Sequence, residues 1–155
     1  MRDIIPDIKY RGRREFIKPL ALLAAARFWE DIAELKLDVL IPVPVHKDRL
    51  KKRGFNQAEL LARELGRLLN IDCRTDILRR GLSTKAQKEL GYSKRVLNLQ
   101  NAFHAKLPSG TLFERVMVVD DIYTTGGTLE ACTEALLSCG VKTVYGLCIC
   151  AGRDS

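Results

Sequence analysis

The chain has 155 residues, of which 46% are hydrophobic, and a formal net charge of +7. This length fits one domain, 1–155, with enough apolar residues for a core. No apolar run approaches the roughly 18 residues of a membrane span, and the N-terminus lacks the apolar stretch and cleavage site of a signal peptide. These features argue against a membrane span and a secretory leader, and we therefore expect a cytoplasmic protein.

Residues 1–14 are polar and basic and are expected to form an N-terminal arm. A helix should follow over 15–36, because apolar residues recur there at helical spacing. Pro19 suits a first helical turn, so the regular helix should begin near it. The residues expected on the apolar face are Phe16, Leu20, Leu23, Ala24, Phe28 and Ile32.

The next run, DVLIPVPV at 38–45, reads as a short strand that two prolines interrupt. Proline cannot donate to a strand ladder, so the strand should end near Ile41. A second helix should begin after Asn56, because this asparagine and Glu59 three residues later have the spacing of a capping box. Its apolar face should comprise Ala58, Leu61, Leu65, Leu68 and Leu69.

The middle of the chain gives weaker signals. Residues 71–79 are a weak strand candidate, and 80–95 have no clear period and are expected to form a loop. SKRVLNLQ at 93–100 is a candidate short helix, and AFHA at 102–105 is a candidate short strand.

The last third of the chain alternates strand and helix. RVMVVD at 115–120 is continuously apolar, as expected for a strand that is covered on both faces of a parallel sheet. A helix should run from about Gly127 to Ser138 and end at Gly140, and KTVYGLCICA at 142–151 should form the final strand. This alternation predicts an α/β fold with a mostly parallel central sheet flanked by helices.

The positive charge is concentrated in two segments. HKDRLKKR at 46–53 holds five Lys or Arg residues against one Asp, and residues 79–95 hold six against one Glu. Basic loops of this kind indicate an anionic partner, either phosphates or nucleic acid, although a solubilising surface is the alternative.

The stretch VVDDIYTTGG at 118–127 carries the strongest functional signal. Ligands of open α/β sheets bind at the carboxyl ends of strands, where Asp120 and Asp121 are expected to lie. The loop after them leads into a helix N-terminus, whose free amides and dipole favour a phosphate. Gly126 and Gly127 permit close approach and positive φ. A sugar phosphate would satisfy both features, and a divalent cation would relieve the repulsion between the two acids.

Two other motifs share part of this pattern. A Walker loop requires a lysine directly after its glycines, and none follows Gly127. A receiver domain also has a strand that ends in adjacent acids, but its acids lie near the N-terminus with a lysine well downstream. Neither motif accounts for the whole pattern of strand, acid pair and Thr/Gly loop.

VMVVDDIYTTGGTL at 116–129 resembles the phosphoribosyl pyrophosphate (PRPP) binding motif of the type I phosphoribosyltransferases. KYRGRRE at 9–15, IPVPVHKDRLKKRGFNQAELLA at 41–62 and RRGLSTKAQKELGYSKRVLNLQNAF at 79–103 extend the resemblance to the ComF family, which is linked to DNA uptake in natural competence. The resemblance runs from Lys9 to Ile149 and implies a type I phosphoribosyltransferase fold. Many ComF proteins begin with a cysteine-rich zinc ribbon that this sequence does not show, so zinc is not expected.

The resemblance also implies roles for individual residues. Asp120 and Asp121 would hold the ribose hydroxyls of PRPP, partly through Mg²⁺, either directly or through water. Arg95 would act in catalysis from a mobile loop that also carries Thr84 and Gln87. The residues implied in binding the 5′-phosphate are Thr124, Thr125, Gly126, Gly127 and Thr128. Those implied in binding the pyrophosphate are Val43, Pro44, Val45, His46, Arg49, Lys52 and Arg53.

Three functions stay open at this point. The leading one is a phosphoribosyltransferase-like protein of the ComF type that binds PRPP and Mg²⁺ and handles incoming single-stranded DNA. One alternative is a non-catalytic module that binds single-stranded nucleic acid on the same fold. The other is a nucleobase salvage phosphoribosyltransferase. The sequence identifies neither the acceptor nucleophile nor the oligomeric state.

Overall fold

The computed structural model of the protein describes residues 14–81 and 102–151. Its centre is a parallel sheet with three strands, which are, in spatial order, β1 (Val39–Pro42), β4 (Arg115–Tyr123) and β5 (Thr143–Ala151). A separate antiparallel pair is formed by β2 (Leu78–Arg80) and β3 (Phe103–Ala105). The α/β class and the parallel central sheet that the sequence predicts are confirmed.

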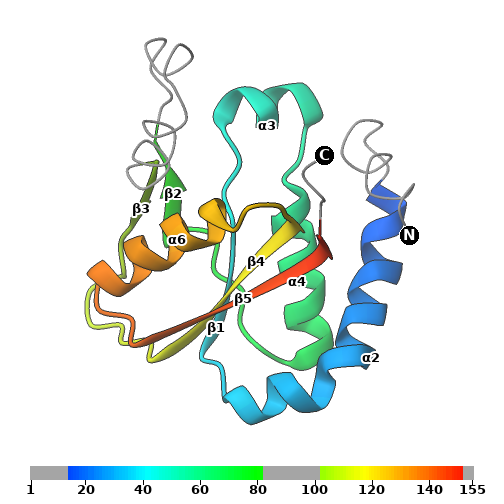
Figure 1. The fold of residues 1–155 in the computed structure, drawn as a ribbon, viewed down its shortest axis with the longest axis horizontal. Helices are drawn as coiled ribbons and strands as arrows, with labels where there is room; N and C mark the ends of the chain where they lie inside the picture. The colour runs from blue at the N-terminus through cyan, green and yellow to red at the C-terminus, as the bar shows by residue number, and fades with distance from the viewer. Residues whose placement is uncertain (1–13, 82–101, 152–155) are drawn as a thin grey trace.

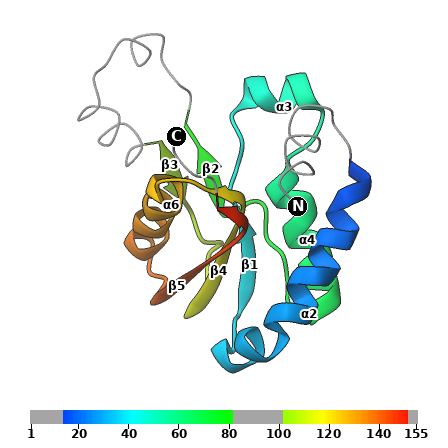
Figure 2. The same cartoon turned by 45° about the vertical axis from the view of Figure 1, so that its right-hand side comes forward.

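Helices cover both faces of the sheet (Figures 1 and 2). One face is covered by α4 (Gln57–Leu69), and α2 (Ile17–Leu35) packs against α4. A short 3₁₀ turn, η1 (Arg14–Phe16), precedes α2. The other face is covered by α6 (Gly127–Ser138), next to which the β2–β3 pair lies. A short helix, α3 (Lys47–Arg53), stands above the end of β1.

The alternation of side chains along β4 divides the core into two clusters. Met117 and Val119 pack with the α2 and α4 side chains, whereas Val116 and Val118 pack with those of α6. Successive side chains of a strand point to opposite faces, so a continuous apolar run serves both clusters at once. This burial is the physical reason why the 115–120 segment reads as apolar throughout.

Several predicted boundaries are confirmed. The regular part of the first helix has Pro19 in its first turn, and α4 begins after Asn56, whose Oδ1 accepts a hydrogen bond from the Ala58 N–H at 3.1 Å. The capping box does not form, because Glu59 accepts from Arg63 Nε at 3.0 Å instead. The bounds of α6 match the prediction, and Gly140 follows it with a φ of 106°.

Other expectations were wrong. The basic segment 46–53 is largely helical rather than a loop, because His46 and Gly54 cap α3 at its two ends. The weak strand predicted over 71–79 is reduced to a single bridge between Cys73 and Leu40, with β2 starting only at Leu78. Leu23, expected on the apolar face of α2, is 59% exposed. The short helix predicted over 93–100 lies outside the described residues.

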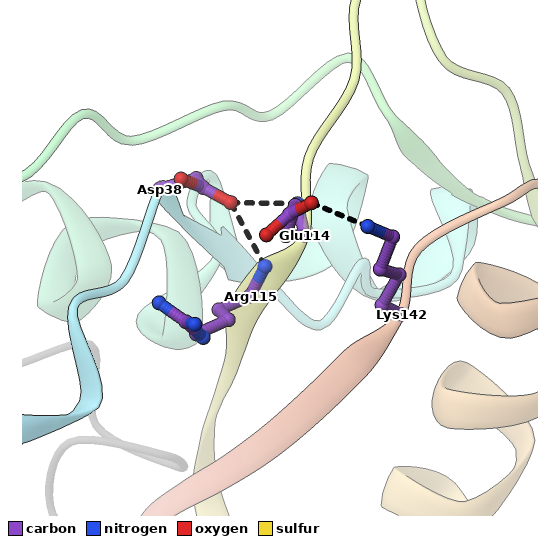
Figure 3. Close-up of polar contacts among 4 residues, drawn as sticks. All are labelled: Asp38, Glu114, Arg115 and Lys142. Carbon is purple, nitrogen blue, oxygen red and sulfur yellow. Dashed lines mark hydrogen bonds and ion pairs between the residues drawn. The ribbon is translucent and has the colours of Figure 1, made fainter.

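The amino ends of the strands are joined by polar contacts (Figure 3). Asp38 Oδ2 accepts hydrogen bonds from the backbone N–H groups of Glu114 and Arg115, at 2.6 and 2.8 Å. The Glu114 carboxylate forms an ion pair with Lys142 before β5. These contacts connect the starts of the three parallel strands, at the end of the sheet opposite to Asp120 and Asp121.

Candidate functional site

The carboxyl end of the sheet places the acid pair beside the end of β1. β1 stops at Pro42, which pairs with Val119, whereas β4 continues to Tyr123 because β5 accompanies it. Asp120 and Asp121 are therefore the first residues of β4 beyond β1. Both lie inside β4, which continues three residues beyond the predicted limit of 120 because β5 pairs with it as far as Tyr123.

Asp120 is nearly buried, with 9% of its surface exposed. The period of the strand puts it on the same face as Val118, which packs toward α6. Its Oδ1 accepts a hydrogen bond of 2.8 Å from the backbone N–H of Asp121. A carboxylate held at this depth has a fixed position, which suits recognition of ligand hydroxyls at defined distances.

The acid pair also acts on nearby thiols. Burial raises the pKa of Cys132 in α6 to about 12, and the negative charge of Asp120 adds to this shift. Burial likewise raises the pKa of Cys148 in β5 to about 12, with both aspartates contributing. All five cysteines are free, and the raised pKa values keep Cys132 and Cys148 protonated at neutral pH.

The loop from Thr124 to Gly126 connects β4 to α6. The side chains of Thr124 and Thr125 are exposed, while Thr128 is half-buried in the first turn of the helix. Gly126 is the N-cap with a φ of 84°, and no side chain of the described residues caps the helix by a hydrogen bond. The first amides of α6 thus have no side-chain acceptor among the residues that the structure describes. Gly127 begins the helix and does not have positive φ, so the expectation for this glycine was wrong.

Gly126 is also in close contact with Tyr123. A β-carbon at position 126 would lie 2.8 Å from the Tyr123 hydroxyl oxygen and 3.3 Å from two ring carbons. The φ of Gly126 favours glycine, and a larger residue there would also displace the Tyr123 ring. The shape of the loop depends on this contact, which the sequence motif alone does not reveal.

The segment Val43 to His46 joins β1 to α3. The Val43 N–H donates to Val119 O at 2.9 Å, and Val43 O accepts from Asn56 Nδ2 at 2.9 Å. Val43 therefore anchors the loop, and since Pro44 has no N–H, any backbone donors to an anion come from Val45 and His46. His46 Nδ1 accepts from the Asp48 N–H at 3.3 Å and caps α3. The described residues contain no cis peptide bond.

The basic residues of the first cluster lie on α3. Arg49 and Lys52 are exposed, whereas the half-buried Arg53 donates from Nη1 to Gln57 Oε1 at 3.1 Å. The structure thus places the charges of Arg49 and Lys52 in solvent above the end of β1, and it holds Arg53 against the start of α4.

Arg80 is a site residue that the sequence did not single out. Its guanidinium lies 5.2 Å from the centre of the Phe103 ring. Burial lowers its pKa, and nearby Arg49 lowers it further, while the negative charge of Asp120 acts in the opposite direction. The end of β2 therefore brings Arg80, a cation in addition to Arg49, toward Asp120. The only signal in the sequence was its membership of a basic cluster.

Arg95, Thr84 and Gln87 lie outside the described residues. Within residues 14–81 and 102–151, no group of three or more His, Cys, Asp or Glu side chains is arranged to hold a metal ion. No helix in the same ranges combines the length and apolar character that a membrane crossing requires.

Comparison with known proteins shows the family to which this chain belongs. The family model described as the phosphoribosyl transferase domain matches residues 20–155 of this chain. Competence protein F of Haemophilus influenzae is 37% identical over 93% of this chain, which covers 66% of that protein. The DNA utilization protein YhgH of Escherichia coli K12 is 32% identical over 97% of the chain and 66% of its own length. The chain thus spans just under two thirds of these relatives.

Solved structures share the fold at low identity. The purine phosphoribosyltransferase of Pyrococcus horikoshii has a TM-score of 0.54 and 19% identity over 90% of this chain and 84% of its own. A hypoxanthine phosphoribosyltransferase of Staphylococcus aureus has a TM-score of 0.50 and 15% identity over 91% and 68% of the two chains. At this identity the likeness establishes the type I phosphoribosyltransferase fold.

Proposed function

The chain belongs to the phosphoribosyl transferase domain family, and we propose that it is a ComF-type member that binds PRPP together with Mg²⁺. One observation carries the proposal. The nearly buried Asp120, with Asp121, stands beside the end of β1, and a short loop leads from β4 into the N-terminus of α6, which no side chain of the described residues caps. One short segment thus offers carboxylates that would bind ribose hydroxyls and backbone amides that would bind the 5′-phosphate.

The donor set fits a magnesium ion that is shared with substrate. Mg²⁺ is usually held by one or two carboxylates, with phosphate oxygens and water completing its octahedron. Asp120 and Asp121 would each supply one such carboxylate, on opposite faces of β4, and a complete protein cage is not required. When bound, Mg²⁺ would neutralise negative charge on the pyrophosphate leaving group. The aspartates themselves favour the positive charge that develops on the ribose as that group departs.

Cations near the end of β1 support pyrophosphate binding there. Arg49 and Lys52 extend from α3, and Arg80 approaches from the end of β2. Like-charged Arg49 and Arg80 repel each other, and an anion between them would relieve that repulsion. These side chains would orient pyrophosphate and stabilise it as it leaves.

Isothermal titration calorimetry tests the proposal. Asp120→Asn/Asp121→Asn should bind PRPP about 10- to 100-fold more weakly in the presence of Mg²⁺, since charged hydrogen bonds are lost. Asp31→Asn, an exposed position on α2, is the matched control and should bind like the wild-type protein. Equal affinity of wild type and double variant, with and without Mg²⁺, would remove the sugar-phosphate interpretation.

A second proposed function is sequence-independent binding of single-stranded DNA, in keeping with a role in DNA utilisation or competence. The observation that favours it is the exposed basic surface of α3, where Lys47, Lys51 and Lys52 are all in solvent. Phosphate contacts release counterions, so the logarithm of the affinity should fall with the logarithm of salt by about 0.7 per contact.

Fluorescence anisotropy of a labelled oligonucleotide across a salt series tests the DNA proposal. Lys51→Ala/Lys52→Ala should make the salt slope shallower by about 1 to 1.5. Lys36→Ala, exposed at the far end of α2, is the control that should leave the slope unchanged. Competition by PRPP would indicate that the two ligands share the end of β1. No binding even at low salt would exclude DNA binding by this chain.

A further inference from the structure

The outer surface of α2 carries an apolar stripe that the proposed function does not use. Leu22, Leu23 and Trp29 are 58%, 59% and 53% exposed, although each is a large apolar side chain. Figures 1 and 2 show α2 on the outside of the molecule, with α4 on its inner side. Contiguous exposed apolar side chains on one helix face are typical of an interaction surface.

The stripe has the spacing of a coiled-coil seam. Leu22, Ala26, Trp29 and Ala33 are separated by four, three and four residues, and all four are exposed. This is the a and d spacing with which two helices pack knobs into holes. The seam lies next to the face that α2 buries in its own core, where Leu20, Ala21, Ala25 and Ile32 point inward.

A hollow opens beside this seam, on the side of α2 that meets Leu68 of α4. Its volume is about 640 Å³, and its α2 lining includes Leu22, Ala25, Ala26 and Trp29. These four residues stand at i, i+3, i+4 and i+7, the set that surrounds one knob in a coiled coil. Ala26 is small between Leu22 and Trp29, so this part of the seam leaves room for a large side chain of a partner.

We propose that α2 is a self-association surface, on which a second copy of this chain packs its own α2 antiparallel. A two-fold axis between residues 27 and 28 brings Trp29 of the second copy to the middle of the hole around Ala26. The same axis places Leu22 against Ala33 of the second copy. Each of the four layers then pairs a large side chain with a small one, as close packing of a helix pair requires.

The charged residues beside the seam are also compatible with the antiparallel arrangement about this two-fold axis. Arg27 and Glu30 both line the hollow. In the antiparallel pair, Glu30 of the second copy lies level with residue 25 of the first. Arg27 is two residues further along the helix, which corresponds to about 3 Å at 1.5 Å per residue. The two-fold axis creates this opposite-charge pair twice. A parallel pair would instead place Arg27 beside Arg27, so charge favours the antiparallel arrangement.

Sedimentation equilibrium of the purified chain tests the proposal. The average mass should rise from one to two chains as the concentration increases from the low micromolar to the submillimolar range. Trp29 is the only tryptophan, so its fluorescence reports on this surface alone. Its emission should shift to shorter wavelength over the same range. A monomer mass at every concentration overturns the proposal.

Paired variants test the register. Trp29→Ala should abolish the dimer, because the knob is removed, while circular dichroism confirms that this exposed substitution leaves the fold intact. Ala26→Trp/Trp29→Ala should restore it, since each layer again joins one large and one small residue. Leu112→Ala, at an 88% exposed position away from α2, should dimerise like the wild type. A dimer that survives Trp29→Ala, or a swap that fails to restore it, contradicts the arrangement.

Discussion

The two ends of the parallel sheet differ in how their charged and polar groups are paired. At the amino end, Asp38 satisfies two backbone N–H groups and Glu114 is paired with Lys142. At the carboxyl end, two adjacent carboxylates lie beside an uncapped helix, and Arg49 lies near Arg80. At the amino end the charges are paired within the chain, whereas at the carboxyl end like-charged residues lie close together.

This difference separates stability from binding. Changes at the amino end should lower the free energy of unfolding and leave ligand affinity intact. Changes at the carboxyl end should lower ligand affinity and leave the free energy of unfolding largely unchanged. Groups arranged for a ligand contribute little to folding and are often unfavourable to it. Three predictions test this division.

The largest effect is expected for Gly126→Ala. A β-carbon at a φ of 84° is strained and would lie 2.8 Å from the Tyr123 hydroxyl, so the loop or the Tyr123 ring must shift. PRPP affinity should fall about 10- to 100-fold as hydrogen bonds to the phosphate are lost. Gly110→Ala is a matched control, since Gly110 has a φ of 77° with no atom within 4 Å of the added β-carbon. Calorimetry that finds the two variants equal would place the phosphate elsewhere.

A smaller effect of the opposite kind is expected at the amino end. Asp38→Ala removes the acceptor of two backbone N–H groups and should cost about 1 kcal/mol in the free energy of unfolding, because solvent partly replaces it. PRPP affinity should be unchanged. Urea titration with Asp31→Ala as the surface control measures the difference. A loss of affinity equal to that of Gly126→Ala would show that the two ends are not independent.

The smallest effect concerns pH. The pKa values of Cys132 and Cys148 are raised to about 12, above the usual range for a thiol. Between that range and about 12, the unfolded chain releases protons that the folded chain retains, so stability should fall as pH rises. Cys132→Ala should flatten this dependence relative to Cys139→Ala, whose thiol is only partly buried. Equal slopes of unfolding free energy between pH 8 and pH 10 in both variants would contradict the assignment.

Local signals predicted most of the elements correctly. The continuous apolar run of β4, the asparagine that caps α4 and the glycine that follows α6 all act through neighbours in sequence. The α3 helix was missed because its caps, His46 and Gly54, are weak signals in a basic segment. Leu23 was placed in the core because a helical period does not tell which face of α2 meets α4.

The sequence by itself determined the α/β class, the chain position of the acid pair and the Thr/Gly loop, and the resemblance to a family, because all of these depend on residues adjacent in the chain. Only the tertiary structure decided that Asp120 stands beyond the end of β1 and that Arg80 approaches it from β2. These features depend on how far β5 extends β4 and on where separate elements meet, and no local pattern encodes such distances.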